Sequence, residues 1–325
     1  MPLLSKSLPR LCFGISAQEA DFSRRGFIKG DLQAKEQLEK SARTFIEGYN
    51  AALDNASFAV LVPRLQMIPE DLRGFAFEGA AMGLMVLDYF TPWKHRLRSF
   101  VEGPGAAHMY MLYVGAGWTL GILPQPSSRF LKQMDPLLGW LALDGYGFHQ
   151  GFFAWKRSFQ QQKRPLRLRG YAQRAFDHGL GRSLWFVKGA DIARIAQTIQ
   201  AFPLDRQPDL WSGIGLACAY AGGIDEHALS AVIQQSGPWY PHLAQGTVFA
   251  VTARYKAGNV LDYTRLACQR ICHADVQEMV DLADNSLKDL PHDETAYETW
   301  RTRIRSQFSI MDKATQATMF SEKIV

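Results

Sequence analysis

The chain has 325 residues, of which 47% are hydrophobic and 21% charged, and a formal net charge of +5. This composition is that of a folded globular protein and excludes disorder as a class, while the length is ample for a real core. A charge this modest argues against a nucleic-acid-binding tail. Four cysteines without a regular framework suggest reduced thiols. The first residues show no continuous apolar stretch and no cleavage site, which predicts a cytoplasmic protein.

Helix start and stop signals alternate along the chain. Residues 31–54 carry apolar side chains at helical spacing behind a capping Asp31, and Pro69 followed by two acidic residues opens an apolar run to Phe90. Further proline, glycine and aspartate signals delimit helices of about 12 to 20 residues. Only residues 57–62 have strand-like character. The pattern therefore predicts an all-α protein.

The most apolar segment is residues 106–123, in which His108 is the single strongly polar side chain. A membrane-spanning helix needs about 20 apolar residues. This segment is shorter, holds three glycines and is flanked by Gly-Pro-Gly and Pro-Gln-Pro. It predicts a buried core helix, with a membrane span as the less favoured alternative.

Glycines one turn into an apolar helix recur at spacings of 36, 36, 28, 34 and 33 residues. They are Gly79, Gly115, Gly151, Gly179, Gly213 and Gly246. Such a period is typical of helix-turn-helix repeats, among which tetratricopeptide-like arrays are the commonest. We therefore expect helical hairpins with a period of about 34, stacked into a superhelical or toroidal domain. The alternative is that an all-α protein gives this spacing by chance.

We predict one domain over residues 1–325. Within it, residues 1–68 are expected to form an N-terminal helical extension and residues 69–273 the helical repeats. Residues 274–325 are expected to form an acidic C-terminal cap and tail, because eight Asp and Glu residues lie between positions 275 and 298.

If the glycine alignment holds, the residue before each glycine lies on one common surface. These residues are Glu78, Val114, Gln150, His178, Ser212 and Gln245, of which five are polar. Polar groups on an apolar face cost free energy unless they are bonded or used. They therefore predict a groove or tunnel on the concave side of the array, lined by aromatic side chains with a few polar groups among them. The alternative is that they bond only to neighbouring helix backbones.

Three residues are candidates for acid/base catalysis. His149 and Asp144 flank a Gly-Tyr-Gly segment and meet only if it bends; a histidine beside a carboxylate titrates near neutral pH. A satisfied core histidine is the alternative. Glu78 lies among apolar neighbours such as Phe75 and Phe77, which would raise its pKa. The residues predicted to contact a ligand are His108, Trp118, Gln150, His178, Arg182, Trp185, Trp211, Tyr220 and Gln245.

No local motif indicates a cofactor. Phosphate-binding loops, paired Cys-x-x-Cys motifs and His-Glu-x-x-His are missing from the sequence, and residues 268–273 have one residue too many for haem attachment. The sequence thus predicts no metal site and leaves the cofactor unassigned. Basic residues gather at 156–174, where a dock for an acidic partner such as an acyl carrier protein competes with a solvated face. Nucleic acid is not expected, because interleaved aromatics are lacking there.

Several motifs, in order along nearly the whole chain, resemble a bacterial family, the UnbL-type accessory proteins of enediyne polyketide gene clusters. They include Phe-Glu-Gly-Ala-Ala-Met-Gly at 77–83 and Asp-Gly-Tyr-Gly-Phe-His-Gln-Gly at 144–151. The other matching stretches are residues 20–26, 113–118, 179–187, 209–223 and 242–246. The biochemical role of that family is unknown, and it offers no assigned catalytic residues. The resemblance implies a role in natural product biosynthesis beside an iterative polyketide synthase. In that role the protein would help to convert a linear polyene into a tailored or cyclised core.

Two functions are therefore expected in turn. The first is an enzyme, a polyene isomerase, cyclase or tailoring enzyme, in which Glu78 and His149 transfer protons to a lipophilic substrate in a hydrophobic cavity. The second is a non-catalytic scaffold or carrier that holds the polyene or bridges pathway enzymes, using the basic residues 156–174 to bind an acyl carrier protein or the synthase. A third possibility is a cavity that cyclises by shape and by aromatic stabilisation of cations.

Overall fold

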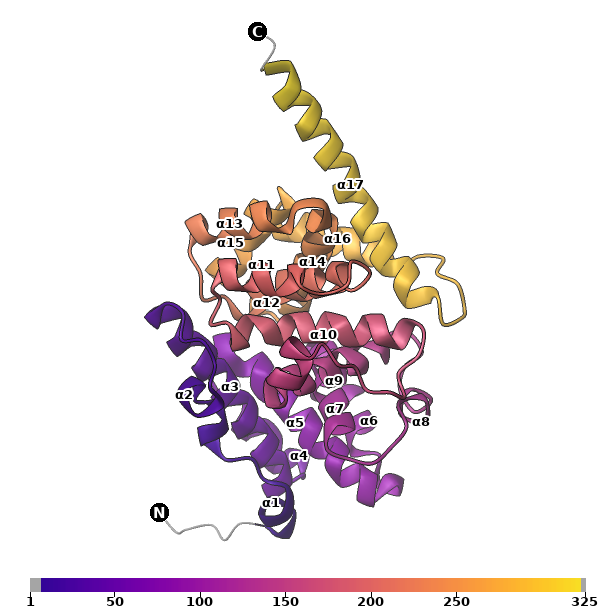
Figure 1. Ribbon diagram of the computed structural model, residues 1–325. Helices are drawn as coiled ribbons and strands as arrows, with labels where there is room; N and C mark the ends of the chain where they lie inside the picture. Colours follow the sequence, from indigo (N-terminus) through magenta and orange to yellow (C-terminus); the bar gives the residue numbers. More distant parts are fainter. Residues whose placement is uncertain (1–6, 323–325) are drawn as a thin grey trace.

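The structure, a computed structural model, describes residues 7–322 and the side chains of residues 7–309 (Figure 1). Within these residues it contains seventeen α-helices and no strand, which confirms the all-α prediction. The α-helices are α1 (Leu8–Phe13), α2 (Phe22–Arg25), α3 (Leu32–Asp54), α4 (Phe58–Gln66), α5 (Glu70–Phe90), α6 (Arg96–Val101), α7 (Met109–Gly117), α8 (Ser127–Leu131), α9 (Trp140–Phe153), α10 (Tyr171–Val187), α11 (Ile192–Gln200), α12 (Gln207–Ala221), α13 (Glu226–Ser236), α14 (Tyr240–Lys256), α15 (Asp262–Ala267), α16 (Val276–Asn285) and α17 (Ala296–Glu322). Short 3₁₀ and π turns connect them: η1 (Ala17–Ala20), η2 (Pro92–Lys94), η3 (Ala106–His108), η4 (Trp118–Gly121), η5 (Lys156–Gln160), η6 (Gly237–Trp239) and η7 (Cys268–Cys272).

Two helix starts follow the sequence signals. The Asp31 side chain accepts hydrogen bonds from the first backbone amides of α3, and α5 begins directly after Pro69. The strand-like expectation for residues 57–62 is wrong, because these residues begin α4. Leu61 and Leu65, one helical turn apart, are both buried there, and this packing overrides the β-propensity of the neighbouring valines.

The apolar segment 106–123 is divided into η3, α7 and η4 and is mostly buried. In the part of the chain that the structure describes, no helix combines the length and the apolar character needed to cross a membrane.

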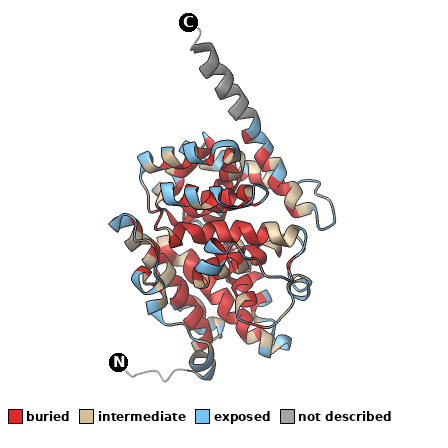
Figure 2. Ribbon diagram, viewed as in Figure 1, coloured by how far each residue is buried: buried red, intermediate tan, exposed pale blue. Residues whose placement is uncertain are grey.

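Seven helices form the centre of the molecule: α3, α5, α7, α9, α10, α12 and α14 each pack against the next in this order. Figure 2 shows that these helices are largely buried, whereas α11 and α13 expose one side. The last helices of the series contact the first ones. Arg254 of α14 donates a hydrogen bond to the carbonyl of Asp71 of α5 (3.1 Å). Gln37 of α3 donates one to the carbonyl of Ala221 of α12 (3.4 Å). The central helices thus enclose an interior. Their description as a superhelical or toroidal array of hairpins stays a prediction.

Glycines set the spacing between these helices. A Cβ on Gly145 would lie 1.9 Å from the Val114 carbonyl oxygen, and one on Gly179 would lie 1.7 Å from that of Asp144. In each case the glycine faces a backbone carbonyl of the preceding central helix, and this carbonyl belongs to the residue just before that helix's own glycine. The same relation holds for Gly115, Gly213 and Gly246. Only hydrogen fits at such contacts.

The third member of the glycine series is therefore Gly145, and the sequence alignment to Gly151 is wrong. Gly151 faces the Ser183 hydroxyl instead. The polar residue on the shared surface is consequently Asp144, whereas Gln150 is only half-buried. The sequence could not distinguish the two glycines, because they lie on the same helix.

Both predicted end segments contain helices that pack against the central series. Residues 1–68 contain α3, which is a central helix rather than part of an extension. Residues 274–325 contain α16 and α17, which pack against α14, and α17 then projects beyond the body (Figure 1). Residues 1–6 and 323–325 of the predicted ends lie outside the described residues.

Candidate functional site

Four charged or titratable side chains meet in the interior. They are Glu78 of α5, Asp144 of α9, and His178 and Arg182 of α10, and we call them the charged cluster. Arg182 donates to one oxygen of Asp144, and the Nδ1 of His178 donates to the other. The second terminal nitrogen of Arg182 lies 3.8 Å from the Glu78 Oε1, which also accepts a hydrogen bond from the Trp118 indole (3.2 Å).

The fold places these groups together through two simple relations. His178 and Arg182 are one helical turn apart and therefore share a face of α10. Asp144 lies opposite them because the Gly179 contact brings the backbones of α9 and α10 together at this level. Sequence reasoning selected all four residues, but it joined Asp144 to His149 rather than to His178.

Glu78 is the group best suited to transfer a proton. Burial raises its pKa to about 7; the positive charge of Arg182 and the Trp118 hydrogen bond oppose this rise, and the negative charge of Asp144 adds to it. A carboxyl group that titrates near neutral pH is populated in both its acidic and its basic form there, as general acid/base catalysis requires.

Within the charged cluster, Asp144 is ionised and His178 is neutral. Burial alone would raise the pKa of Asp144, but the adjacent Arg182 and His178 outweigh it, so that the pKa is lowered and the carboxylate is ionised. Burial lowers the pKa of His178 despite its contact with Asp144. We therefore assign a neutral imidazole that donates from Nδ1, while Arg182 neutralises the aspartate.

Glu78 and Arg182 face an apolar pocket between α3, α5, α9, α10 and α12, which we call the inner pocket. Its cavity volume is about 30 Å³, which leaves little room beyond a water molecule. Its aromatic lining consists of Phe45, Phe75, Trp118, Phe148, Phe152, Phe153, Phe186 and Tyr220. The pocket is thus narrow, nearly dry and bordered by rings, and a ligand enters it only if some of these rings turn.

An N-terminal strap, residues 15–30, crosses one end of the inner pocket. Its Arg25 donates to the carbonyls of Phe152 (2.8 Å) and Phe153 (2.9 Å), and its guanidinium lies 5.0 Å from the Phe153 ring centroid. Phe153 is half-buried, unlike most of the lining. The strap therefore covers the outer end of the pocket.

The structure does not bring His149 and Asp144 together, because α9 runs straight through the Gly-Tyr-Gly segment that the sequence prediction required to bend. His149 packs edge-on against Trp118 (5.8 Å between centroids), outside the lining of the inner pocket. Burial lowers its pKa to about 4. His108 is stacked on Phe77 (4.2 Å) and has a pKa lowered by burial to about 4. Both are neutral core histidines in this arrangement.

Trp185, Trp211 and Gln245, predicted to contact a ligand, are buried outside the inner pocket. The Trp185 indole donates to the Gly222 carbonyl (3.0 Å), which caps the end of α12. Of the predicted ligand contacts, Trp118, Arg182 and Tyr220 line the pocket. Phe45 and Phe186 were not predicted from the sequence as pocket residues. The apolar face of the 31–54 helix was the available signal for Phe45.

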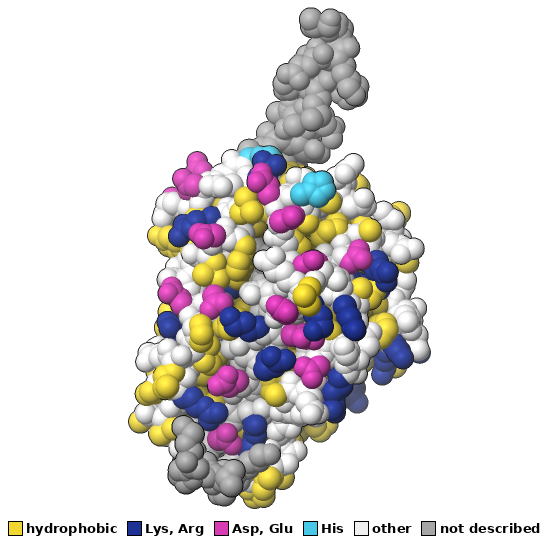
Figure 3. Space-filling model, turned by 90° about the vertical axis from the view of Figure 1, so that its left-hand side faces the viewer, with side chains coloured by type: hydrophobic (Ala, Val, Ile, Leu, Met, Phe, Trp, Pro, Cys, Tyr) yellow, Lys and Arg dark blue, Asp and Glu magenta, His cyan; other side chains and the backbone are white. Residues whose placement is uncertain are grey.

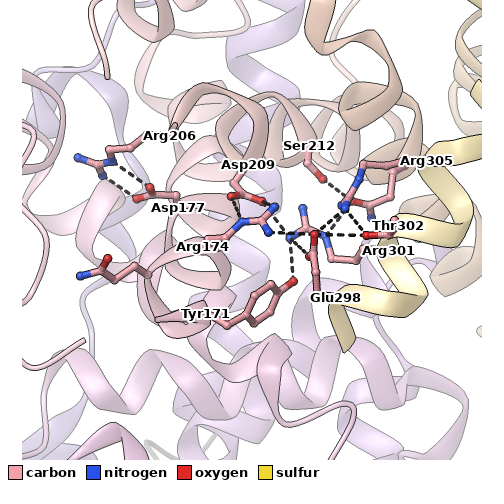
Figure 4. A network of polar contacts seen from close by, with 12 residues as sticks. Tyr171, Arg174, Asp177, Arg206, Asp209, Ser212, Glu298, Arg301, Thr302 and Arg305 are labelled. Atoms are coloured by element: carbon pink, nitrogen blue, oxygen red, sulfur yellow. Dashed lines mark hydrogen bonds and ion pairs between the residues drawn. The ribbon is translucent and has the colours of Figure 1, made fainter. Parts of the chain in front are cut away.

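Gln245 belongs to a second polar network. This network joins α10, α12, α14 and α17, and Figure 4 shows its residues on α10, α12 and α17. Its Oε1 accepts from Ser212 and from Arg301, both at 2.9 Å. Arg301 also pairs with Asp209 (3.0 Å), and Glu298 pairs with Arg174 (2.9 Å). These ion pairs are buried or half-buried and attach α17 to the body.

The basic stretch 156–174 is only partly available to a partner. Arg164 pairs with the buried Asp177, and Arg174 pairs with Asp209. Arg157, Lys163, Arg167 and Arg169 are exposed. On the face shown in Figure 3, basic and acidic side chains are interspersed. Within the described residues, no three His, Cys, Asp or Glu side chains gather as a metal site would require.

We expect the free energy of unfolding of the Glu78→Gln variant to rise relative to that of the wild type as the pH is raised. In the wild type the pKa of Glu78 is raised from 4.5 to about 7, so between these values the folded chain keeps a proton that the unfolded chain has released. The free energy of unfolding therefore falls across this window, by about 3 kcal/mol for this group. Glutamine lacks this dependence. Urea unfolding of both proteins at pH 5 and pH 8 measures the difference; equal pH profiles would contradict the raised pKa.

The fold and the site together define an all-helical protein with a charged cluster on the wall of a buried apolar pocket. Residues 4–308 match a family described as proteins of unknown function, DUF1702. Because this match covers most of the chain, the protein belongs to that family. Neither a curated protein nor a solved structure matches the chain.

Proposed function

We propose that the protein binds an extended, conjugated apolar molecule in the inner pocket and transfers a proton to it from Glu78. The observation that carries this proposal is a buried carboxyl with a pKa of about 7 on the wall of an aromatic pocket. Buried carboxyls with perturbed pKa values gather at functional sites, although structural ion pairs also perturb them.

The aromatic lining favours a flat, unsaturated ligand. Phe148 lies 5.0 Å from Trp118 and 5.3 Å from Phe186, so that ring faces and edges border the pocket from three helical elements. Such surfaces suit conjugated chains and attract cations. The resemblance to accessory proteins of enediyne polyketide clusters points to the same class, a linear polyene on the way to a cyclised or tailored product.

The proposed reaction is a proton-catalysed isomerisation or cyclisation. The Glu78 acid gives its proton to a polyene carbon, which forms a C–H bond and leaves a carboxylate and a delocalised carbocation. The carboxylate then takes a proton from another carbon, so that a double bond shifts or a ring closes and the acid is restored. Arg182 stabilises the carboxylate, and Asp144 with His178 positions Arg182. The dry pocket protects the cation from water.

The test is to follow the absorbance of a linear conjugated polyene incubated with purified protein. Replacing Glu78 by Gln is expected to slow conversion by at least about 100-fold, the usual lower range for a general acid. Glu47→Gln, on the exposed side of α3, is the matched control and should convert substrate like the wild type. Conversion by the Glu78 variant at the wild-type rate would refute the assignment. His149→Ala tests the earlier candidate separately.

The second candidate function is a non-catalytic carrier that delivers the polyene to a partner. The exposed Arg167 and Arg169, beside Leu166 with 85% of its surface exposed, favour this reading. Arg164 is unsuitable as a probe because it pairs with Asp177 inside the fold. The double variant Arg167→Ser/Arg169→Ser should weaken binding of an acyl carrier protein and leave polyene binding intact. Unchanged carrier binding would count against this function.

A further inference from the structure

A second apolar pocket lies on the other side of Arg182. It is formed by α7, α9, α10, α12, α14 and α17 and has a cavity volume of about 20 Å³, so a ligand enters it only if lining side chains move. Tyr110, Phe249 and Trp300 contribute aromatic rings, and the Phe249 and Trp300 centroids are 4.5 Å apart. This second pocket therefore repeats the chemistry of the inner pocket.

The two pockets share one wall. Arg182, Leu216 and Tyr220 line both of them, so the two spaces adjoin at these side chains. Arg182 is held by Asp144 and lies over the Phe148 ring (5.1 Å), while Leu216 and Tyr220 are neighbours on one face of α12. A chain that passes this wall would occupy both pockets in an extended form.

Two buried hydroxyl groups beside the wall are unsatisfied. The hydroxyl oxygens of Tyr220 and Thr252 find no hydrogen-bond partner among the described residues, although both side chains are 2% exposed. Leaving a buried hydroxyl unpaired costs about 1–3 kcal/mol, so each of these groups calls for a partner such as a ligand or an ordered water. Tyr220 lines both pockets and Thr252 lines the second, so a ligand that fills the pockets contacts both side chains.

We propose that the two pockets form one tunnel for a linear conjugated chain that carries a hydroxyl or carbonyl oxygen partway along its length. One part of the chain lies against Glu78 in the inner pocket, and the other lies between Phe249 and Tyr110 in the second pocket. The chain's oxygen bonds to the Tyr220 and Thr252 hydroxyls at the wall. This inference rests on the proposed function and adds the length and polarity of the substrate.

Chain length provides the test. The probes are a long conjugated tetraene alcohol and a short conjugated diene alcohol, titrated against the purified protein by tryptophan fluorescence. The wild type should bind the long probe at least about tenfold more tightly, an affinity difference of about 1.4 kcal/mol. Ala250→Leu fills the second pocket alone and should remove this preference while leaving binding of the short probe unchanged. Ala217→Leu fills the inner pocket and should weaken both probes.

A second measurement protects the result against misfolding of the leucine variants. Trp300 lines only the second pocket and Trp118 only the inner one. Trp300→Phe should therefore remove part of the fluorescence quenching by the long probe and none of that by the short probe. Equal affinity for both probes, or quenching by the long probe that is independent of Trp300, overturns the tunnel alone. Failure of both probes to bind overturns the proposed function as well.

Discussion

The Gly179→Ala variant is expected to lose at least about 3 kcal/mol of folding free energy, the upper range for overpacking a core. Its new methyl group would lie 1.7 Å from the carbonyl oxygen and 2.5 Å from the carbonyl carbon of Asp144, so α9 and α10 would have to separate. Backbone atoms inside a helix cannot turn away as a side chain does. The same substitution in an unobstructed helix would stabilise by about 0.5–1 kcal/mol.

Urea unfolding monitored by circular dichroism measures this effect. Gly74→Ala is the matched control, since it is also buried in a helix but meets the tip of the Tyr220 side chain rather than backbone. We expect a clearly smaller loss there. A Gly179→Ala protein as stable as the Gly74→Ala protein would contradict the close helix contact.

Replacing Arg182 by Met should destabilise the protein by about 3–5 kcal/mol, because it leaves the ionised Asp144 buried without its cation. Arg182 lowers the pKa values of both Asp144 and Glu78. Without it both carboxyls are harder to ionise in the folded state. The folded chain then holds protons that the unfolded chain has released, so the loss should be larger at pH 8 than at pH 5.

The double variant Arg182→Met/Asp144→Asn separates a charge effect from a packing effect. Asparagine removes the orphaned charge and can still accept a hydrogen bond from His178, so the double variant should be more stable than Arg182→Met alone. A double variant as unstable as the sum of its single changes would show that the two residues do not interact. Equilibrium unfolding at both pH values supplies the comparison.

Local signals predicted much of the fold. Helix caps and apolar periodicity act within a few residues, which is why the starts of α3 and α5 and the all-α class were correct. Residues 57–62 were misassigned because a short apolar run is ambiguous between helix and strand until its packing is known. The glycine series was found, but its third member was wrong, because α9 holds Gly145, Gly147 and Gly151 and only contact across the helices selects one.

The site residues were easier to predict than their partners. Glu78 was selected for its apolar neighbours and His178 for its place before a glycine of the series. Asp144 was selected for its nearness to His149, and Arg182 was named only as a ligand contact. Which of them touch is decided by the register between helices far apart in the chain. His149, five residues from Asp144, was therefore paired with it, whereas His178, on the next helix, is its actual partner.

The glycine contacts also determine how the interior can respond to a guest. Helices that touch backbone to backbone are packed as closely as they can be, and these contacts hold them at a fixed separation. The helices therefore do not move apart to accommodate a bulky molecule. Only ring rotation of side chains such as Phe152 and Phe153 can make room. A cavity that opens by ring rotation opens as a narrow gap between ring faces. It therefore selects ligands by their thickness rather than their volume, and a thin, flat molecule binds where a rounder one of equal mass does not.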